Sequence, residues 1–137
     1  MGERVKRLEQ TILEVVKLAP APVQEVIRGL QALRGVANVS AVTIAVELGN
    51  ISSRFESVRK SMGYCGVFPS EVSSGKRIRK GGITKTGNAH PRRIVVESAW
   101  SYRHRPFLRA KLRRRQEGVS AEITDIAWKA QNRLHKR

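Results

Sequence analysis

Apolar residues recur at helical spacing toward both ends of the chain, and this spacing is lost in the middle. Intervals of three and four predict an amphipathic helix over residues 3–18, with an apolar stripe of Val5, Leu8, Ile12 and Val15. Pro20 is expected to end this helix. The stripe spans only about two heptads, too short for a free-standing coiled coil, so it packs within the chain or onto a domain outside it.

Two further helices are predicted to form a helix-hairpin-helix-like element. The first covers residues 22–33, and the second begins at Asn38 or Ser40 as its N-cap and ends at Gly49. Gly35 permits a tight turn between them. Backbone N–H groups in such a turn can hold a nucleic-acid phosphate, although an ordinary pair of antiparallel helices has the same pattern.

Capping signals mark the remaining helices. Ser53 followed by Glu56 is a capping box that is expected to open a short helix. Asn88 is expected to cap a longer helix that carries Pro91 in its first turn, where a missing N–H costs little. Ser120 is expected to cap a last amphipathic helix.

Glycines replace the helical pattern between residues 63 and 87. Residues 76–80 and 83–86, on either side of Gly81 and Gly82, are predicted to form a small β-hairpin. The fold class expected is therefore mainly α: a helical domain with a helix-hairpin-helix-like element and a small glycine-rich loop or β-hairpin insert.

Charge is concentrated in one third of the chain. The whole sequence has 27 Lys and Arg against 11 Asp and Glu, a formal net charge of +16. Residues 72–116 carry 14 of those basic residues and a single acid, Glu97, and include a short basic helix predicted at 108–116. Such an excess predicts a polyanionic partner, either nucleic acid or an anionic membrane. The membrane is disfavoured because the basic segments lack a broad apolar face.

Other classes of protein are disfavoured by simple counts. The single cysteine, Cys65, permits no internal disulfide and is most simply a small buried residue. The histidines do not combine with it at a metal-binding spacing, so no metal site is expected. No apolar stretch suits a membrane span or a signal peptide, which predicts a cytoplasmic protein.

The segment 73–93 carries the strongest candidate chemistry. Ser73 and Ser74 precede Gly75, and no acid lies between them and residue 93. Glycines let a backbone approach a phosphate closely, and cations neutralise its charge. A serine hydroxyl there would face a polarised phosphorus, as a nucleophile requires. Composition alone supports a flexible phosphate-binding loop, and the Walker A pattern does not occur.

A spaced series of motifs resembles a known family. It contains Gly-Val at 35–36, Glu-Leu-Gly at 47–49, Ser-Ser-Gly at 73–75, Gly-Ile-Thr-Lys-x-Gly-Asn at 82–88, and Arg-Arg before Glu-x-Ala-Trp at 97–100. This series resembles the C-terminal domain of the insertion-sequence one-ten transposases, which are DEDD-type, bridge-RNA-guided recombinases. The resemblance covers essentially the whole chain.

The resemblance implies DNA transposition through a covalent phosphoserine link. Ser74 is the first choice for the nucleophile and Ser73 the reserve. Cations near the serines, or on the basic helix that follows, are expected to bind nucleic acid: Lys76, Arg77, Arg79, Lys80, Lys85, Arg92, Arg93, Arg113, Arg114 and Arg115. A guide RNA, a homo-oligomer and a nucleoid-associated location are implied as well.

The chain also departs from the family pattern. The RuvC-like domain that supplies acidic metal ligands is absent, so no cofactor is expected in this chain and Mg²⁺ only with that domain. Residues 1–33 are expected to connect to it, and 34–137 to form the transposase domain, truncated at its end. Isolated activity is therefore not expected. Pro91 stands where the family usually has an apolar residue, which predicts a distorted helix.

The alternative from another class is a non-catalytic, basic nucleic-acid-binding protein, ribosomal or architectural. It accounts for the charge but not for the ordered series of motifs. Trp100 and Trp128 are expected to pack in the core rather than stack on bases, because they have apolar neighbours at helical spacing. His90 is expected on a helix surface, with a phosphate contact as the other possibility.

Overall fold

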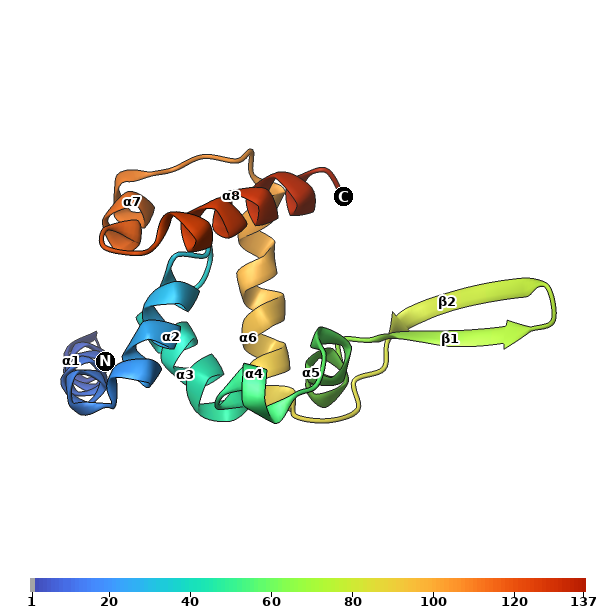
Figure 1. Ribbon diagram of the computed structural model, residues 1–137, viewed down its shortest axis with the longest axis horizontal. Coiled ribbons are helices and arrows are strands. Elements are labelled where there is room, and N and C mark those ends of the chain that lie inside the picture. The colour runs from blue at the N-terminus through green and yellow to red at the C-terminus, as the bar shows by residue number, and fades with distance from the viewer. Residues whose placement is uncertain (1) are drawn as a thin grey trace.

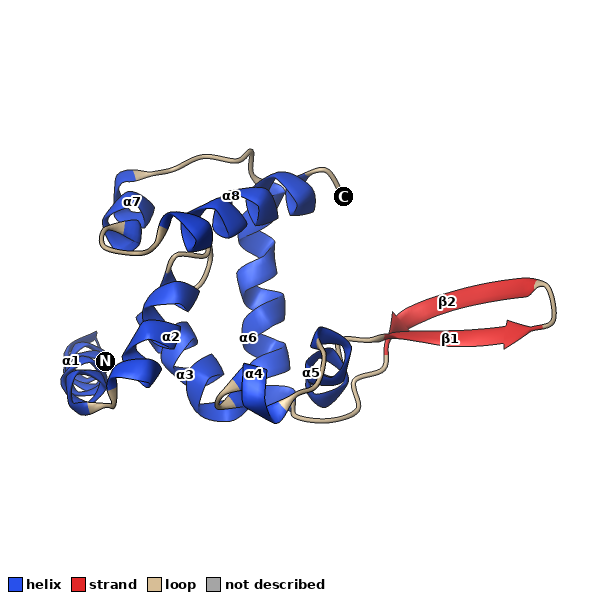
Figure 2. Cartoon of the chain, viewed as in Figure 1, coloured by secondary structure: helices blue, strands red, loops and turns tan. Residues whose placement is uncertain are grey.

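The computed structural model describes residues 2–137 and is mainly α-helical, as the sequence predicts (Figures 1 and 2). The elements in chain order are α1 (Gly2–Leu18), α2 (Ala21–Gln31), α3 (Asn38–Leu48), α4 (Ile51–Arg54), α5 (Val58–Cys65), β1 (Pro69–Ser74), β2 (Arg77–Ile83), α6 (Ala89–Ala99), the 3₁₀ helix η1 (Trp100–Arg103), α7 (Ala110–Gln116) and α8 (Ala121–His135). The helices form one body, from which the β1–β2 hairpin projects (Figure 1).

The core lies between the α2–α3 pair and the elements that cover it. Its buried members are Ile27, Val36, Ala41, Ile44, Ala45, Leu48 and Cys65. Since Ile27 and Val36 share this core, residues on both sides of the predicted domain boundary at residue 33 fold together. The boundary itself stays a prediction.

The turn between α2 and α3 packs against the protein itself. Gly35 has a φ of +82°, and a Cβ there would lie 2.5 Å from the Ser98 carbonyl oxygen. The carbonyl of Val36 accepts a hydrogen bond from Arg115. Because α6 and α7 occupy the surroundings of this turn, the arrangement favours an ordinary pair of antiparallel helices over a phosphate-binding turn.

The first helix uses only part of its apolar stripe. It contacts α3; Ile12 of the stripe is half-buried, and Val16, which lies outside the stripe, packs at the edge of the core. Leu8 and Val15 remain 58% and 60% exposed. Packing within the chain therefore accounts for one side of α1 and leaves the rest of the stripe uncovered.

Two predicted helix starts are wrong. The N-cap of α3 is Ala37, which offers no side-chain cap, so neither Asn38 nor Ser40 has that role. Ser53 lies inside α4, and the N-cap of α5 is Ser57, whose hydroxyl accepts from the N–H of Lys60 at 3.3 Å. The capping-box pattern failed because the backbone is extended between α4 and α5, which moves the helix start past Ser53.

The hairpin exists, but its turn is not where the glycine pair predicts it. Ser74 pairs with Arg77 and closes a two-residue turn at Gly75 and Lys76, with a φ of +59° at Gly75. A positive φ at the first central position is typical of type II′ turns. Gly81 and Gly82 instead lie inside β2, opposite a register shift between Pro69 and Glu71. Strand glycines often mark such irregularities.

The later helices follow the predicted caps. The Asn88 side chain accepts from the N–H of His90 at 3.0 Å, and the hydroxyl of Ser120 accepts from Ile123 at 3.4 Å. Pro91 is buried in the first turn of α6, where no intrahelical donor is lost, and the helix runs unbroken to Ala99. The expected distortion at Pro91 is therefore not found.

Candidate functional site

The two candidate nucleophiles, Ser73 and Ser74, end strand β1 and are exposed. Because successive residues of a strand point to opposite faces, Ser73 and Ser74 present their hydroxyls on different sides of the hairpin. Ser73 shares its face with Glu71, and its hydroxyl donates a hydrogen bond to the Glu71 carboxylate. Ser74 lies beside the turn and pairs with Arg77 across the ladder. The two serines thus differ in both partner and direction.

Four cations surround the serines and carry no ion pair among the described residues: Lys76, Arg77, Arg79 and Lys80. All four are exposed. Glu71 is the one acid on the hairpin, so the local field is positive. A positive field of this kind attracts anions such as a phosphodiester.

The hairpin is held at its base by backbone hydrogen bonds. The N–H of Lys85 donates to the carbonyl of Gly66 at 3.0 Å, and the N–H of Asn88 donates to that of Tyr64 at 2.8 Å. Gly87 has a φ of +95°, and a Cβ there would lie 2.3 Å from the Tyr64 carbonyl oxygen. We call this contact between 64–66 and 84–88 the clamp. It fixes the direction in which the serines project.

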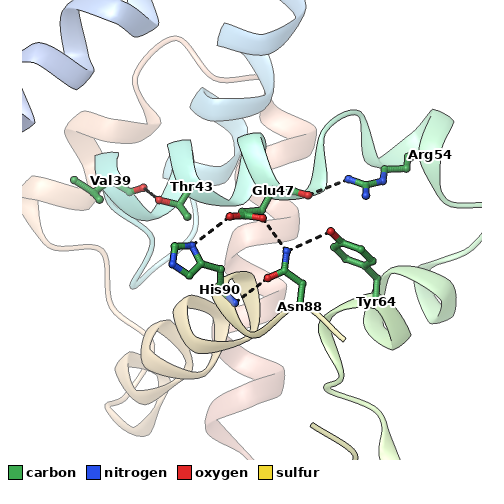
Figure 3. Close-up of polar contacts among 7 residues, drawn as sticks. All are labelled: Val39, Thr43, Glu47, Arg54, Tyr64, Asn88 and His90. Carbon is green, nitrogen blue, oxygen red and sulfur yellow. Dashed lines mark hydrogen bonds and ion pairs between the residues drawn. The ribbon is translucent and has the colours of Figure 1, made fainter. Parts of the chain in front are cut away.

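A polar cluster that sequence reasoning missed ties the clamp to the helical body (Figure 3). The side-chain amide of Asn88 donates to the Glu47 carboxylate at 2.8 Å and contacts the Tyr64 hydroxyl at 3.2 Å. The other Glu47 oxygen lies 3.2 Å from Nδ1 of His90. One carboxylate at the end of α3 therefore holds the start of α6. The available signal was Glu47 itself, an acid interrupting the most apolar stretch of the chain.

The remaining predicted cations fall into separate places. Lys85 lies in the clamp with a φ of +57°, and Arg92 donates to the Cys65 carbonyl at 3.3 Å. Arg93 pairs with Glu97 at 2.9 Å, and this hydrogen bond raises the pKa of the Arg93 guanidinium. Lys85 and Arg92 therefore contact the clamp segment 64–66, whereas Arg93 is paired along α6. Their predicted role in binding nucleic acid stays a prediction.

The cations of α7 are not near the serines. α7 and the hairpin lie toward opposite ends of the long axis of the molecule (Figure 1). Arg113 and Arg114 are exposed, whereas the Arg115 guanidinium donates to the Val36 carbonyl. Burial lowers the pKa of Arg115. The structure thus commits Arg115 to an internal contact and leaves its two neighbours free for a partner.

The described residues 2–137 contain no group of three or more His, Cys, Asp or Glu that could hold a metal ion. The described residues therefore offer no carboxylate cluster that fits Mg²⁺. Within the same range, no helix is long and apolar enough to cross a membrane.

Comparisons with known proteins agree with the motif series. A family model described as "Transposase IS116/IS110/IS902 family" matches residues 28–113. The chain is also 47% identical, over 112 residues, to "Putative transposase y4qE" of Sinorhizobium fredii (strain NBRC 101917 / NGR234). That match covers 82% of this chain and 28% of the relative, so the chain spans little more than a quarter of the relative's length. No solved structure matches significantly. The chain belongs to the IS116/IS110/IS902 family of transposases.

Proposed function

We propose that this chain is the serine-bearing, C-terminal part of a DNA transposase that cleaves DNA through a covalent phosphoserine link. The observation that carries the proposal is the hairpin. It presents two adjacent hydroxyls and four unpaired cations on an exposed ribbon whose base is clamped to the helical body. A nucleophile for a polymeric phosphodiester needs this combination of access, fixed direction and positive field.

The proposed step is a transesterification at phosphorus. The serine Oγ attacks the phosphorus of a DNA phosphodiester, so that an Oγ–P bond forms while the bond from phosphorus to the leaving deoxyribose oxygen breaks. The serine gives up its proton, and the leaving oxygen takes one up. The number of phosphodiester bonds is conserved, and the cut strand stays attached to the protein. Lys76 and Arg77, next to the serines, stabilise the charge on the phosphate oxygens.

The two serines are distinguished by their surroundings. Ser74, our first choice, lies beside the turn, where Gly75 leaves open space and Arg77 is its ladder partner. Ser73 is the alternative, and its hydrogen bond to Glu71 is the specific observation in its favour. A carboxylate in that position orients the hydroxyl and accepts its proton. For Ser74 the proton passes to solvent.

The remaining parts of the reaction come from outside this chain. A RuvC-like domain would supply the acidic ligands for Mg²⁺, and a guide RNA would select the DNA sequence by base pairing. Assembly as a homo-oligomer would bring two strands together at the chromosome. This chain alone is therefore expected to bind DNA and not to cleave it.

The test is a trapping experiment with full-length transposase that carries this segment, its guide RNA and labelled donor DNA. Covalent protein–DNA adducts are separated on a denaturing gel. Loss of the adduct in Ser74→Ala and its retention in Ser73→Ala would support Ser74. The reverse result, with a fall in rate for Glu71→Gln, would assign the step to Ser73. Adducts that survive the double substitution would overturn the proposal.

A matched control uses a residue on the same ribbon. Val72 is 76% exposed and lies on the hairpin without a nucleophilic atom. Val72→Ala should leave the adduct unchanged. The alternative of a non-catalytic ribosomal or architectural protein would give no adduct with any variant, while DNA binding would be retained.

A further inference from the structure

A second candidate site lies at the far end of α6 from the hairpin. Arg34, Trp100, Ser101, Arg103, His104 and Arg109 line a surface hollow of about 500 Å³. We call this hollow the η1 pocket. None of its lining residues is acidic, and three of the six are arginines. In chain order α6 follows the hairpin and η1 follows α6, so this pocket, which includes Trp100 and Ser101 of η1, lies at the opposite end of α6 from the clamp and the hairpin.

Arg34 is held in the pocket by hydrogen bonds to residues that lie far from it in the sequence. Its Nη1 donates to the Arg105 carbonyl at 2.9 Å and to the buried Gln131 side chain at 3.3 Å. The close approach of Gly35 to Ser98 and Ser101 brings the α2–α3 turn, and Arg34 with it, against η1. One cation of the pocket is therefore held in place before any ligand arrives.

Core packing does not account for the position of Trp100. The sequence predicts a core tryptophan, yet the Trp100 side chain is 66% exposed, and Trp128 is 41% exposed, so the core assignment is wrong for both. The Arg103 guanidinium lies over the Trp100 ring, 5.8 Å from its centroid. An indole left open to solvent between arginines gains little from folding. It is suited to stack on a flat partner that carries negative charge nearby.

From this arrangement we propose that the η1 pocket binds one unpaired nucleotide of a single-stranded nucleic acid. The base stacks on Trp100, and the flanking phosphates are held by Arg103 and Arg109. The strand must be single-stranded at this point, since a paired base keeps its face covered by its neighbours in the duplex. The inference rests on the proposed function only for the class of ligand, a nucleic acid.

The distance between the two sites gives the pocket a role of its own. Eleven residues of α6, at 1.5 Å per residue, separate η1 from the clamp by about 16 Å along the helix. The nucleotide held in the pocket would therefore not be the one that meets the serines, which lie beyond the clamp at the end of β1. The pocket would anchor a single-stranded region while the hairpin acts elsewhere.

Tryptophan fluorescence tests the pocket directly, using the full chain. Trp128→Phe leaves Trp100 as the single tryptophan in the sequence. Six-nucleotide RNA and DNA strands of one sequence are titrated against this variant, together with an abasic strand that carries the same number of phosphates. Saturable quenching by the base-containing strands, and weak or no quenching by the abasic strand, is the expected result. Comparing RNA with DNA identifies which sugar the pocket accepts.

Affinity measurements on substituted chains complete the test. Trp100→Ala should weaken binding of the six-nucleotide strand by roughly tenfold or more, and Trp100→Phe should restore part of it. Trp128→Phe should bind as the unsubstituted chain does, and circular dichroism verifies the fold of each variant. Equal affinity of Trp100→Ala, or equal binding of the abasic strand, would overturn the proposal. Failure of the phosphoserine trapping would leave it standing, because the measurement needs no cleavage.

Discussion

Isoleucine side chains are buried in the helical core and exposed in the β1–β2 hairpin. Ile44 in α3 is 5% exposed and packs in the core, whereas Ile78 in β2 is 67% exposed. An isolated two-stranded hairpin is at best marginally stable in water, and every residue of these two strands except Ser70 is exposed. Most of its side chains therefore contribute little to packing. Substitutions in the core are therefore expected to change the stability of the fold. Substitutions of exposed hairpin side chains are expected to change function and leave the stability nearly unchanged.

The largest expected effect comes from truncating the core side of this comparison. Ile44→Ala should lower the free energy of unfolding by about 2–5 kcal/mol, because it removes buried methyl groups and leaves a cavity. Ile78→Ala should change it by less than about 0.5 kcal/mol, since the side chain is solvated in both states. Urea denaturation followed by circular dichroism measures both. Similar losses for the two variants would remove the distinction between the regions.

The clamp joins the two regions, and a substitution of its Gly87 is expected to have an effect of intermediate size. Gly87→Ala should cost about 1–3 kcal/mol, because the residue has a positive φ and the new Cβ would meet the Tyr64 carbonyl. Gly63→Ala is the matched control, since Gly63 lies in α5 with nothing within 4 Å of the added atom. That change should be neutral or stabilising by up to about 1 kcal/mol. Denaturant midpoints report the cost, and faster trypsin cleavage in 76–80 would report a released hairpin.

Local signals in the sequence predicted most of the helices but misplaced the starts of α3 and α5, and they missed what depends on contacts across the fold. The caps at Asn88 and Ser120 are formed by neighbouring residues, so their pattern was sufficient. The turn was misplaced to Gly81 and Gly82 because the register depends on pairing between β1 and β2. Two adjacent glycines are a turn signal only when nothing distant fixes them in a strand.

The candidate site shows the same division. The serines and the hairpin cations could be grouped from the sequence because they are adjacent in it, and their roles stay predictions. Glu47 and Asn88 were not linked, since 41 residues separate them and only folding joins α3 to α6. Trp100 was assigned to the core from apolar neighbours, but the change from α6 to η1 at that residue leaves it exposed. Trp128 lies inside the unbroken helix α8 and is still 41% exposed, so apolar neighbours at helical spacing do not by themselves place a side chain in the core.

The salt dependence of DNA binding is expected to distinguish Arg79 of the hairpin from Arg115, which contacts the core. Arg79→Gln should reduce the slope of log K against log salt concentration for duplex DNA by about 0.9, as expected for one lost phosphate contact, with stability unchanged. Arg115→Gln should leave the slope unchanged. It should lower the free energy of unfolding by about 1–3 kcal/mol, because the Arg115 guanidinium donates a hydrogen bond to the Val36 carbonyl. Filter binding at several salt concentrations and urea denaturation separate the two. A fall in slope for Arg115→Gln would show that the internal contact opens on binding.

The smallest effect concerns Cys65, which lies within the clamp and is 5% exposed. Burial raises the pKa of its thiol, and the nearby Arg92 charge opposes this only in part. The thiolate is the reactive form, so alkylation by iodoacetamide at pH 8 should be slower in the folded chain than in urea. Gly87→Ala should speed the folded-state reaction by loosening the clamp, whereas Ile78→Ala should not. A folded chain that reacts as fast as the unfolded one would mean that the clamp opens freely. The direction in which the serines project would then not be fixed by the helical body.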